Sequence, residues 1–183
     1  MTATATTSSV STWKIDPAHS SAEFKVKHMM ISNVKGKFSG ISGTLTLDEA
    51  DPTRSTVEAV VQVATLSTGD EQRDAHLKSA DFFDAEKFPL IAFQGKEVTE
   101  QGGEWKLKGD LTIHGVTREI SLDVEGPTPE HKDPWGNLRI GATATGKLNR
   151  KDYGLGWNAA LEAGGVLVGD EVKLTIDLEA IRQ

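Results

Sequence analysis

Residues 105–113 read WKLKGDLTI, with an apolar residue or glycine at every odd position and a polar residue at every even one. Because successive side chains of a β-strand point to opposite faces, this pattern predicts a strand with one dry face and one wet face. Such alternation is typical of antiparallel sheets, in which commonly only one face is covered. The same alternation returns in residues 118–125, near the end in residues 172–180 and near the start in residues 22–28.

Counting the remaining segments of this kind predicts eight strands in total, separated by glycine- or proline-containing turns. In the second of them the apolar positions change from even to odd numbers around Gly40. A slip of one residue would turn the dry face outward, so we predict a bulge or bend at Gly40. The eight predicted strands are residues 22–28, 36–47, 55–66, 89–99, 105–113, 118–125, 138–148 and 172–180.

Two stretches break the alternation. Thr68 and Glu71 have the spacing of a capping box, and residues 71–80 contain no glycine, proline or β-branched residue. This combination predicts a short helix beginning near Glu71. A second helical turn is predicted around residues 150–154.

Eight antiparallel strands with one dry face can form either a sandwich or a closed barrel. Their even spacing along the chain favours an up-and-down barrel, which also removes exposed sheet edges. An eight-stranded barrel is either filled by its own side chains or holds one small ligand. The inward positions mix phenylalanines with small residues such as Ala59, Gly95, Gly109, Ala142 and Ala144. Small inward residues leave room for a ligand or simply fit the taper of the barrel, and the sequence leaves both interpretations open.

The length of 183 residues corresponds to about one domain. We assign that domain to residues 13–183 and expect the small, polar residues 1–12 to form a disordered tail. The tail lacks the basic and apolar regions of a secretory signal, so we expect a cytoplasmic protein. No apolar run approaches the length of a membrane span.

Charge and composition exclude several classes of function. A net charge of −7 and a pI near 5.2 argue against a nonspecific nucleic-acid binder and against a basic membrane-surface protein. The absence of cysteine excludes disulfides, thiolate zinc sites and cysteine nucleophiles. No metal or cofactor is predicted, because none of the five histidines stands at a recognised metal spacing: His19, His28, His76, His114 and His131.

One short segment contains residue types that could carry chemistry. Arg73, Asp74 and His76 place a guanidinium, an acid and a base within one helical turn. General acid–base catalysis would need a nucleophile or a bound water within reach of them. A charge-paired helix packed over a barrel end is the simpler interpretation. The nearby Phe82 and Phe83 could either seal the barrel or form an apolar mouth.

Ordered motifs along the chain are similar to those of a known family. They are Trp13-Lys-Ile-Asp-Pro-Ala-His-Ser20 with Phe24-x-Val26-x-His28-Met29 and Gly36-x-Phe38, then Thr68-Gly69 with Arg73-Asp74-x-His76-Leu77-x-Ser79-x-Asp81-Phe82-Phe83-Asp84, then Gly109-x-Leu111-Thr112-Ile113-x-Gly115-Val116-Thr117, and Asn149-Arg150-x-Asp152-Tyr153-Gly154-Leu155. Through them, residues 13–181 resemble the YceI-like family.

The resemblance implies a lipocalin-like, eight-stranded antiparallel barrel that holds a long prenyl chain or a similar amphiphile in its pore, and that often forms homodimers. With the alternation, it predicts a carrier or store for an isoprenoid-type lipid without catalysis. We expect the tail to contact inward residues of the strands: Phe24, Val26, Phe38, Leu45, Ile91, Phe93, Leu111 and Ile113. We expect the head group at the barrel mouth, near His19, His28, Arg73, Asp74, His76, Phe82 and Phe83.

Two alternatives remain at this point. One is an enzyme acting on a prenyl or quinone substrate with Asp74 and His76 as an acid–base pair. The other is a filled barrel that serves as an interaction module and binds no small ligand.

Overall fold

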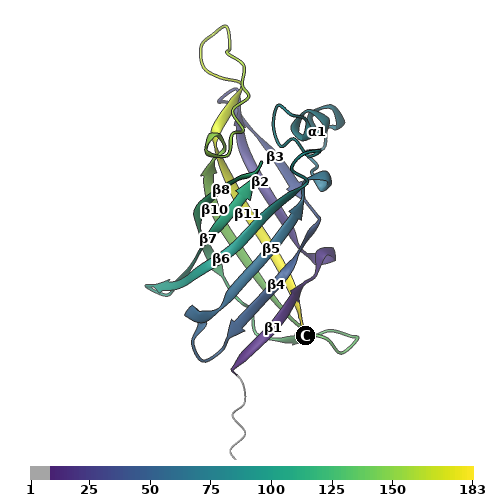
Figure 1. Ribbon diagram of the computed structural model, residues 1–183, viewed down its shortest axis with the longest axis vertical. Helices are drawn as coiled ribbons and strands as arrows, with labels where there is room; N and C mark the ends of the chain where they lie inside the picture. The colour runs from purple at the N-terminus through teal and green to yellow at the C-terminus, as the bar shows by residue number, and fades with distance from the viewer. Residues whose placement is uncertain (1–8) are drawn as a thin grey trace, which may run out of the picture.

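The computed structural model describes residues 9–183 and consists mainly of antiparallel strands (Figure 1). The strands are β1 (Val10–Ile15), β2 (Ser21–His28), β3 (Ser32–Phe38), β4 (Ile41–Asp48), β5 (Thr56–Gln62), β6 (Leu90–Gln101), β7 (Glu104–Ile113), β8 (Val116–Glu125), β9 (His131–Lys132), β10 (Leu138–Asn149) and β11 (Val168–Arg182). The helical segments are α1 (Glu71–Lys78), η1 (Pro17–His19), η2 (Pro52–Arg54), η3 (Val63–Thr65) and η4 (Arg150–Tyr153).

The sheet closes on itself because β11 pairs with β10 on one side and with both β1 and β2 on the other. β1 and β2 therefore share one position in the barrel. β3 and β4 share the next, since β3 pairs with β2 and β4 with β1. The remaining neighbours follow the order of the chain, except that β8 pairs with β10 and the two-residue β9 pairs with β10 outside this circuit. This arrangement confirms the predicted eight-stranded up-and-down barrel.

The predicted bend at Gly40 is also confirmed. β3 ends at Phe38 and β4 begins at Ile41, so the strand is interrupted where its apolar positions change parity. The Thr65 hydroxyl accepts the N–H groups of Ser39 and Gly40, and the Gly40 carbonyl accepts the N–H of Gln62. These bonds satisfy the backbone groups that the break removes from the ladder.

The predicted helices are present, but the capping residue was wrong. α1 runs from Glu71 to Lys78, and its N-cap is Asp70, whose carboxylate accepts the N–H of Arg73. Thr68 instead donates its N–H and hydroxyl to the Asp74 carboxylate. Asp70 is the better cap because it immediately precedes the first turn, where the unpaired N–H groups lie.

The boundary of the N-terminal tail also needs correction. β1 begins at Val10, so residues 10–12 belong to the barrel although they were assigned to a disordered tail. Val10 pairs with Asp48 and Thr12 with Thr46, and these backbone bonds do not depend on side-chain polarity. Residues 1–8 lie outside the described part of the chain.

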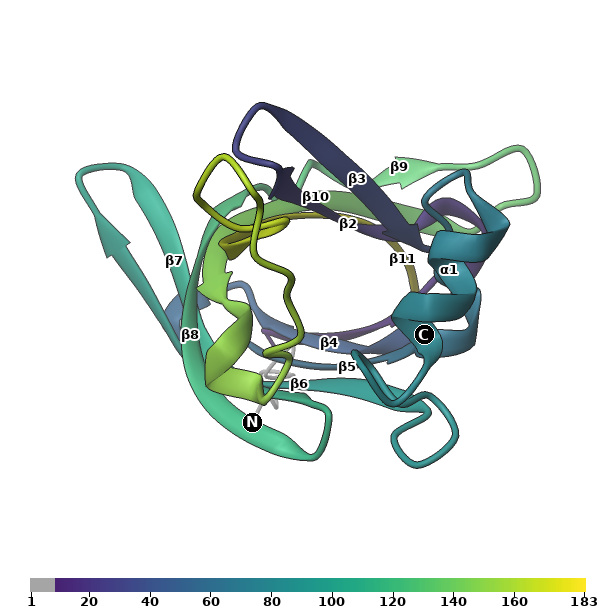
Figure 2. The same cartoon turned by 90° about the horizontal axis from the view of Figure 1, so that it is seen from above.

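The two ends of the barrel differ. At one end, hereafter the closed end, Trp13, Ile140 and Ala180 form a buried core with Leu45, Leu47 and Leu138 packed against it. At the other, the α1 end, α1 and η4 lie on the rim together with the β2–β3 hairpin (Figures 1 and 2). No helix of residues 9–183 is both long and apolar enough to cross a bilayer.

Candidate ligand lumen

The barrel encloses an apolar cavity of about 220 Å³. An apolar cavity of about 150 Å³ already stays dry and admits a benzene-sized molecule. Every barrel position contributes to the lining, and Glu23 and Arg150 are its only charged residues among those described. The apolar lining residues are Ala22, Phe24, Val26, Phe38, Ile41, Val57, Ala59, Val61, Leu77, Phe82, Phe83, Ile91, Phe93, Leu107, Leu111, Ile113, Ile120, Leu122, Ala144, Leu148, Leu155, Val168, Val172, Leu174, Ile176 and Leu178.

The structure places the residues predicted to line the pore along this lumen, with one exception. Those on the lumen are Phe24, Val26, Phe38, Ile91, Phe93, Leu111 and Ile113. Leu45 is not among the lining residues, because it packs on the core of Trp13, Ile140 and Ala180 at the closed end. Its inward direction was predicted correctly, but the alternation carries no information on height along the barrel axis.

The inward glycines hold space for neighbouring side chains rather than for a ligand. A Cβ added at Gly36 would lie 2.2 Å from the Phe24 ring, and one at Gly109 would lie 2.4 Å from the Phe93 ring. The outer ends of both rings therefore occupy the space above a glycine of the neighbouring strand. Ala59 and Ala144, in contrast, lie on the lumen itself.

Aromatic side chains form the rim of the lumen at the α1 end. Phe82 and Phe83 both line the cavity, as predicted for a mouth. The Phe83 ring meets Phe38 edge-on at 5.7 Å, and Phe82 lies 5.3 Å from Trp157. The rim is therefore a packed aromatic cluster that joins the segment after α1 to the loop before β11.

Arg150, predicted to lie in a helical turn but not among the predicted site residues, is buried beside the lumen at this end. Its guanidinium donates to the carbonyls of Leu155, Trp157, Val168 and Gly169. Burial lowers the pKa of this guanidinium, while Asp170, 3.7 Å away, acts in the opposite direction. Arg150 thus fastens η4 and residues 155–157 to the start of β11.

The polar residues of α1 lie beyond the lumen and are held by local contacts. The Arg73 guanidinium donates to the hydroxyl and carbonyl of Thr68, and Asp74 accepts from the same residue. His76 Nε2 lies 2.8 Å from Asp81, and its ring packs against Phe82 and Trp157. Asp74 and His76 therefore have different partners and do not form the acid–base pair that was considered from the sequence.

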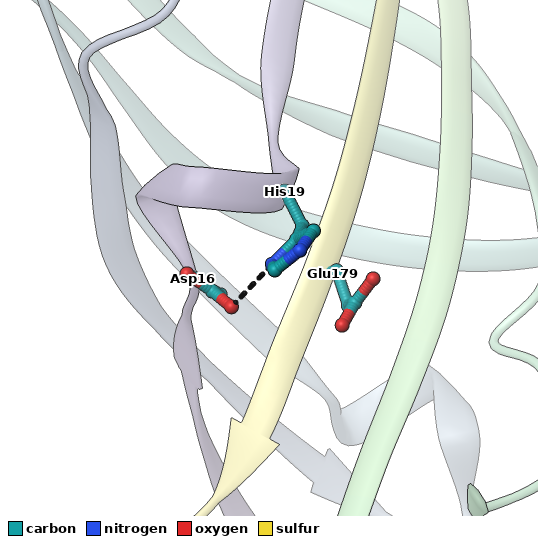
Figure 3. A group of neighbouring side chains, drawn as sticks. All are labelled: Asp16, His19 and Glu179. Carbon is teal, nitrogen blue, oxygen red and sulfur yellow. Dashed lines mark hydrogen bonds and ion pairs between the residues drawn. The ribbon is translucent and has the colours of Figure 1, made fainter. Parts of the chain in front are cut away.

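The two other histidines predicted at the mouth lie in different places. His28 ends β2 at the α1 end, with the same parity as Phe24 and Val26. His19 does not lie at the mouth, because η1 turns the chain between β1 and β2 on the outer wall. There its Nδ1 lies 2.8 Å from Asp16 and its ring is close to Glu179 (Figure 3).

The group of Asp16, His19 and Glu179 is an ion-pair network. Their potential ligand atoms lie within 4.8 Å of one another, the arrangement that a metal site would need. However, Arg139 donates to Asp16 at 2.7 Å and to Glu179 at 2.6 Å, and it also pairs with Asp133 at 2.7 Å. A guanidinium already occupies the centre of these carboxylates, so the group joins the β1–β2 corner to β10 and β11.

We predict that Arg139→Met makes the protein less stable at pH 7 and weakens the dependence of its stability on acid. Hydrogen bonds from His19 and Arg139 lower the pKa of Asp16 from 3.8 to about 2, and Arg139 is the largest cause of the lowered pKa of Asp133. A carboxylate with a lowered pKa stabilises the fold above its unfolded pKa, and this contribution is lost as the pH falls through the folded pKa.

The measurement is the urea midpoint at several pH values between 7 and 2. The midpoints of the wild type and Arg139→Met should converge as the pH falls from 4 to 2. The control is Lys106→Met, which removes an exposed ion pair with Asp123 and should change the midpoint little. A constant difference between wild type and Arg139→Met at all pH values would contradict the prediction.

Comparisons with known proteins agree with this architecture. Residues 13–180 match the YceI-like domain. A UPF0312 protein of Staphylococcus aureus (strain N315) is 41% identical over 164 residues, which cover 90% of this chain and 94% of the relative. The crystal structure of Burkholderia cenocepacia BcnA is similar with a TM-score of 0.75 at 21% identity, covering 90% of this chain and 98% of that one.

A polyisoprenoid binding domain from Saccharophagus degradans, implicated in plant cell wall breakdown, has the same fold. Its TM-score is 0.67 at 14% identity, and the match covers 93% of this chain and 98% of that domain. The family match spans the barrel from β1 to β11, including the lumen and the α1 end. The chain therefore belongs to the family of YceI-like domain proteins.

Proposed function

We propose that this protein binds the tail of a long-chain isoprenoid-type lipid in its lumen and carries or stores that lipid without chemical change. The observation that carries the proposal is the cavity of about 220 Å³ enclosed by apolar side chains from every barrel position. The similarity in fold to a polyisoprenoid binding domain supports the same class of ligand.

The energetics of such a site favour a long apolar tail. Each buried methylene contributes about 0.8 kcal/mol, so ten enclosed carbons supply roughly 8 kcal/mol before costs. Ordering of the tail and loss of free translation reduce that figure. Because burial of apolar surface is non-directional, affinity depends on the length of tail enclosed more than on individual polar contacts.

The head group of the proposed ligand lies at the α1 end. The closed end is occupied by Trp13, Ile140 and Ala180, so it has no room for a polar group. Phe82 and Phe83 would contact the part of the tail nearest the mouth. Arg73, His76 and His28 are the residues at this end that could meet an anionic head, since a guanidinium pairs well with phosphate and an imidazole N–H can donate to it.

The acid–base role considered for Asp74 and His76 has no geometric support. Asp74 accepts two hydrogen bonds from Thr68, and His76 is paired with Asp81. Binding without chemistry is therefore the function that we propose.

Lipid extraction and mass spectrometry of the protein purified from a native-like host test this function. We expect a co-purified prenyl amphiphile, and we expect a fluorescent prenyl probe to be displaced by the extracted lipid. Finding no bound amphiphile together with no binding of the prenyl probe would contradict the proposal. It would favour a barrel that serves only as an interaction module.

A further inference from the structure

The β2–β3 hairpin ends in three exposed apolar residues. Met29, Met30 and Ile31, hereafter the β2–β3 tip, have exposed fractions of 40%, 59% and 79%. Met29 and Met30 have φ values of 51° and 62°. This left-handed region favours Gly, Asn or Asp, so methionine is unfavourable here for the backbone conformation. It is also unfavourable because its apolar side chain is exposed to water. Exposed apolar groups on a strained turn indicate a contact surface.

Lysines are concentrated on the outer wall next to this tip. The partners in neighbouring strands form a row, since Lys35 pairs with Lys25, Lys25 with Lys173, and Lys173 with Lys147. Like charges directly opposite each other in a sheet are destabilising. Lys27 and Lys37 extend the group along the same face of β2 and β3. We call these six lysines the lysine row.

Most of the lysine row is free to meet an external anion. Lys147 forms an ion pair with Glu171, at 3.5 Å. The other five form no ion pair with any residue between Ser9 and Gln183. The protein therefore carries a local basic face, although its net charge is −7.

We propose that the β2–β3 tip and the lysine row dock this protein on an anionic phospholipid bilayer. The tip would enter the acyl region, and the lysines would contact the phosphates. A strand rises about 3.3 Å per residue, which places Lys25 and Lys35, each four residues from the tip, roughly 13 Å from it, at the depth of the head groups. Stable attachment to a membrane surface commonly requires such a pair of signals, one apolar and one basic.

The docking surface lies next to the lumen. The tip continues the strands that carry Phe24, Val26 and Phe38 on the cavity wall. The Met29 N–H donates to the Leu167 carbonyl, so the tip also contacts the loop before β11 at the α1 end (Figures 1 and 2). Docking would thus bring the proposed mouth close to the bilayer. The docking surface itself does not depend on whether the lumen holds a lipid.

Flotation with vesicles tests the proposal. We expect the purified protein to float with vesicles of phosphatidylcholine and phosphatidylglycerol, and to bind vesicles of pure phosphatidylcholine at least about 10-fold more weakly. Salt at about 0.5 M should release much of the bound protein by screening the lysines.

The triple variant Met29→Asn, Met30→Asn, Ile31→Ser should bind about 10-fold more weakly than the wild type, and asparagine preserves the left-handed turn. Lys25→Gln with Lys35→Gln should weaken the salt dependence, while the three remaining unpaired lysines of the row preserve part of it.

The matched control is Trp135→Ser, because Trp135 is 82% exposed in the loop between β9 and β10, and Leu138 at the end of that loop packs on the core of the closed end. It should bind vesicles like the wild type. Absence of binding to anionic vesicles at low salt would overturn the proposal, as would equal losses in the tip and Trp135 variants. If the tip variant instead converts a dimer to a monomer while the wild type ignores vesicles, the tip is an interface between copies and the proposal is wrong. Unchanged thermal midpoints show that the variants fold.

Discussion

Replacing Arg150 with methionine is expected to lower the free energy of unfolding by about 3 to 5 kcal/mol, because a buried acceptor without a donor costs roughly 1 to 3 kcal/mol. The Arg150 guanidinium serves the carbonyls of Leu155, Trp157, Val168 and Gly169. Methionine fills a similar volume but donates no hydrogen bond. The change therefore tests the hydrogen bonds and not the packing of the side chain.

Urea unfolding, followed by tryptophan fluorescence, measures this effect. Arg150→Lys should fall between wild type and Arg150→Met, since an ammonium has three donors and lacks the planar fork of a guanidinium. The control is Arg118→Met, in which an exposed arginine loses a long contact to the Thr117 carbonyl. That control should change the free energy by no more than about 0.5 kcal/mol. A loss of less than about 1 kcal/mol in Arg150→Met would contradict the role we assign to these bonds.

Period-2 alternation predicted the strands, and their even spacing along the chain favoured a closed barrel over a sandwich. The alternation reports which face of each strand is dry, and a break in parity located the interruption at Gly40. It failed at β1, where Ser11 and Thr12 look like a polar tail. Ser11 is nevertheless buried, because its hydroxyl accepts the Trp13 indole N–H at 2.8 Å. The hydrophobic pattern of the sequence does not show that such a hydrogen bond allows a serine hydroxyl to be buried.

The sequence predicted which side chains of the candidate site point into the barrel. It did not predict how far along the barrel axis each residue lies, or which distant residues it contacts. Leu45 points inward as predicted but lies below the cavity. His19 was predicted at the mouth together with the other residues expected to meet the head group, whereas the pairing of β1 with β4 and β11 places it on the outer wall, away from the mouth. The role of Arg150 was not predicted because its partners are backbone carbonyls of residues 155–169. Every residue has such a carbonyl, so the sequence does not show which ones accept a hydrogen bond from Arg150.

Ala144→Phe is expected to weaken the binding of a prenyl probe by about 200-fold, since a ring in the lumen displaces about four tail carbons, each worth roughly 0.8 kcal/mol. Ala144 lies on the cavity wall between its partners Val124 on β8 and Ile176 on β11. The new ring would enter space that is already empty. The free energy of unfolding should therefore stay within about 1 kcal/mol of wild type or increase.

The control for this variant is Thr145→Phe, which places the same ring on the exposed outer face of β10. Titration of a fluorescent prenyl probe should show tight binding to Thr145→Phe and weak binding to Ala144→Phe. If both variants bind like the wild type, the ligand does not occupy the lumen and the cavity is incidental to function. If both bind weakly with unchanged urea midpoints, the ligand contacts the outer wall of β10. Weaker probe binding in Ala144→Phe but not in Thr145→Phe supports a tail enclosed by the barrel. Both variants introduce the same ring on β10, and the ring points into the lumen in one and outward in the other.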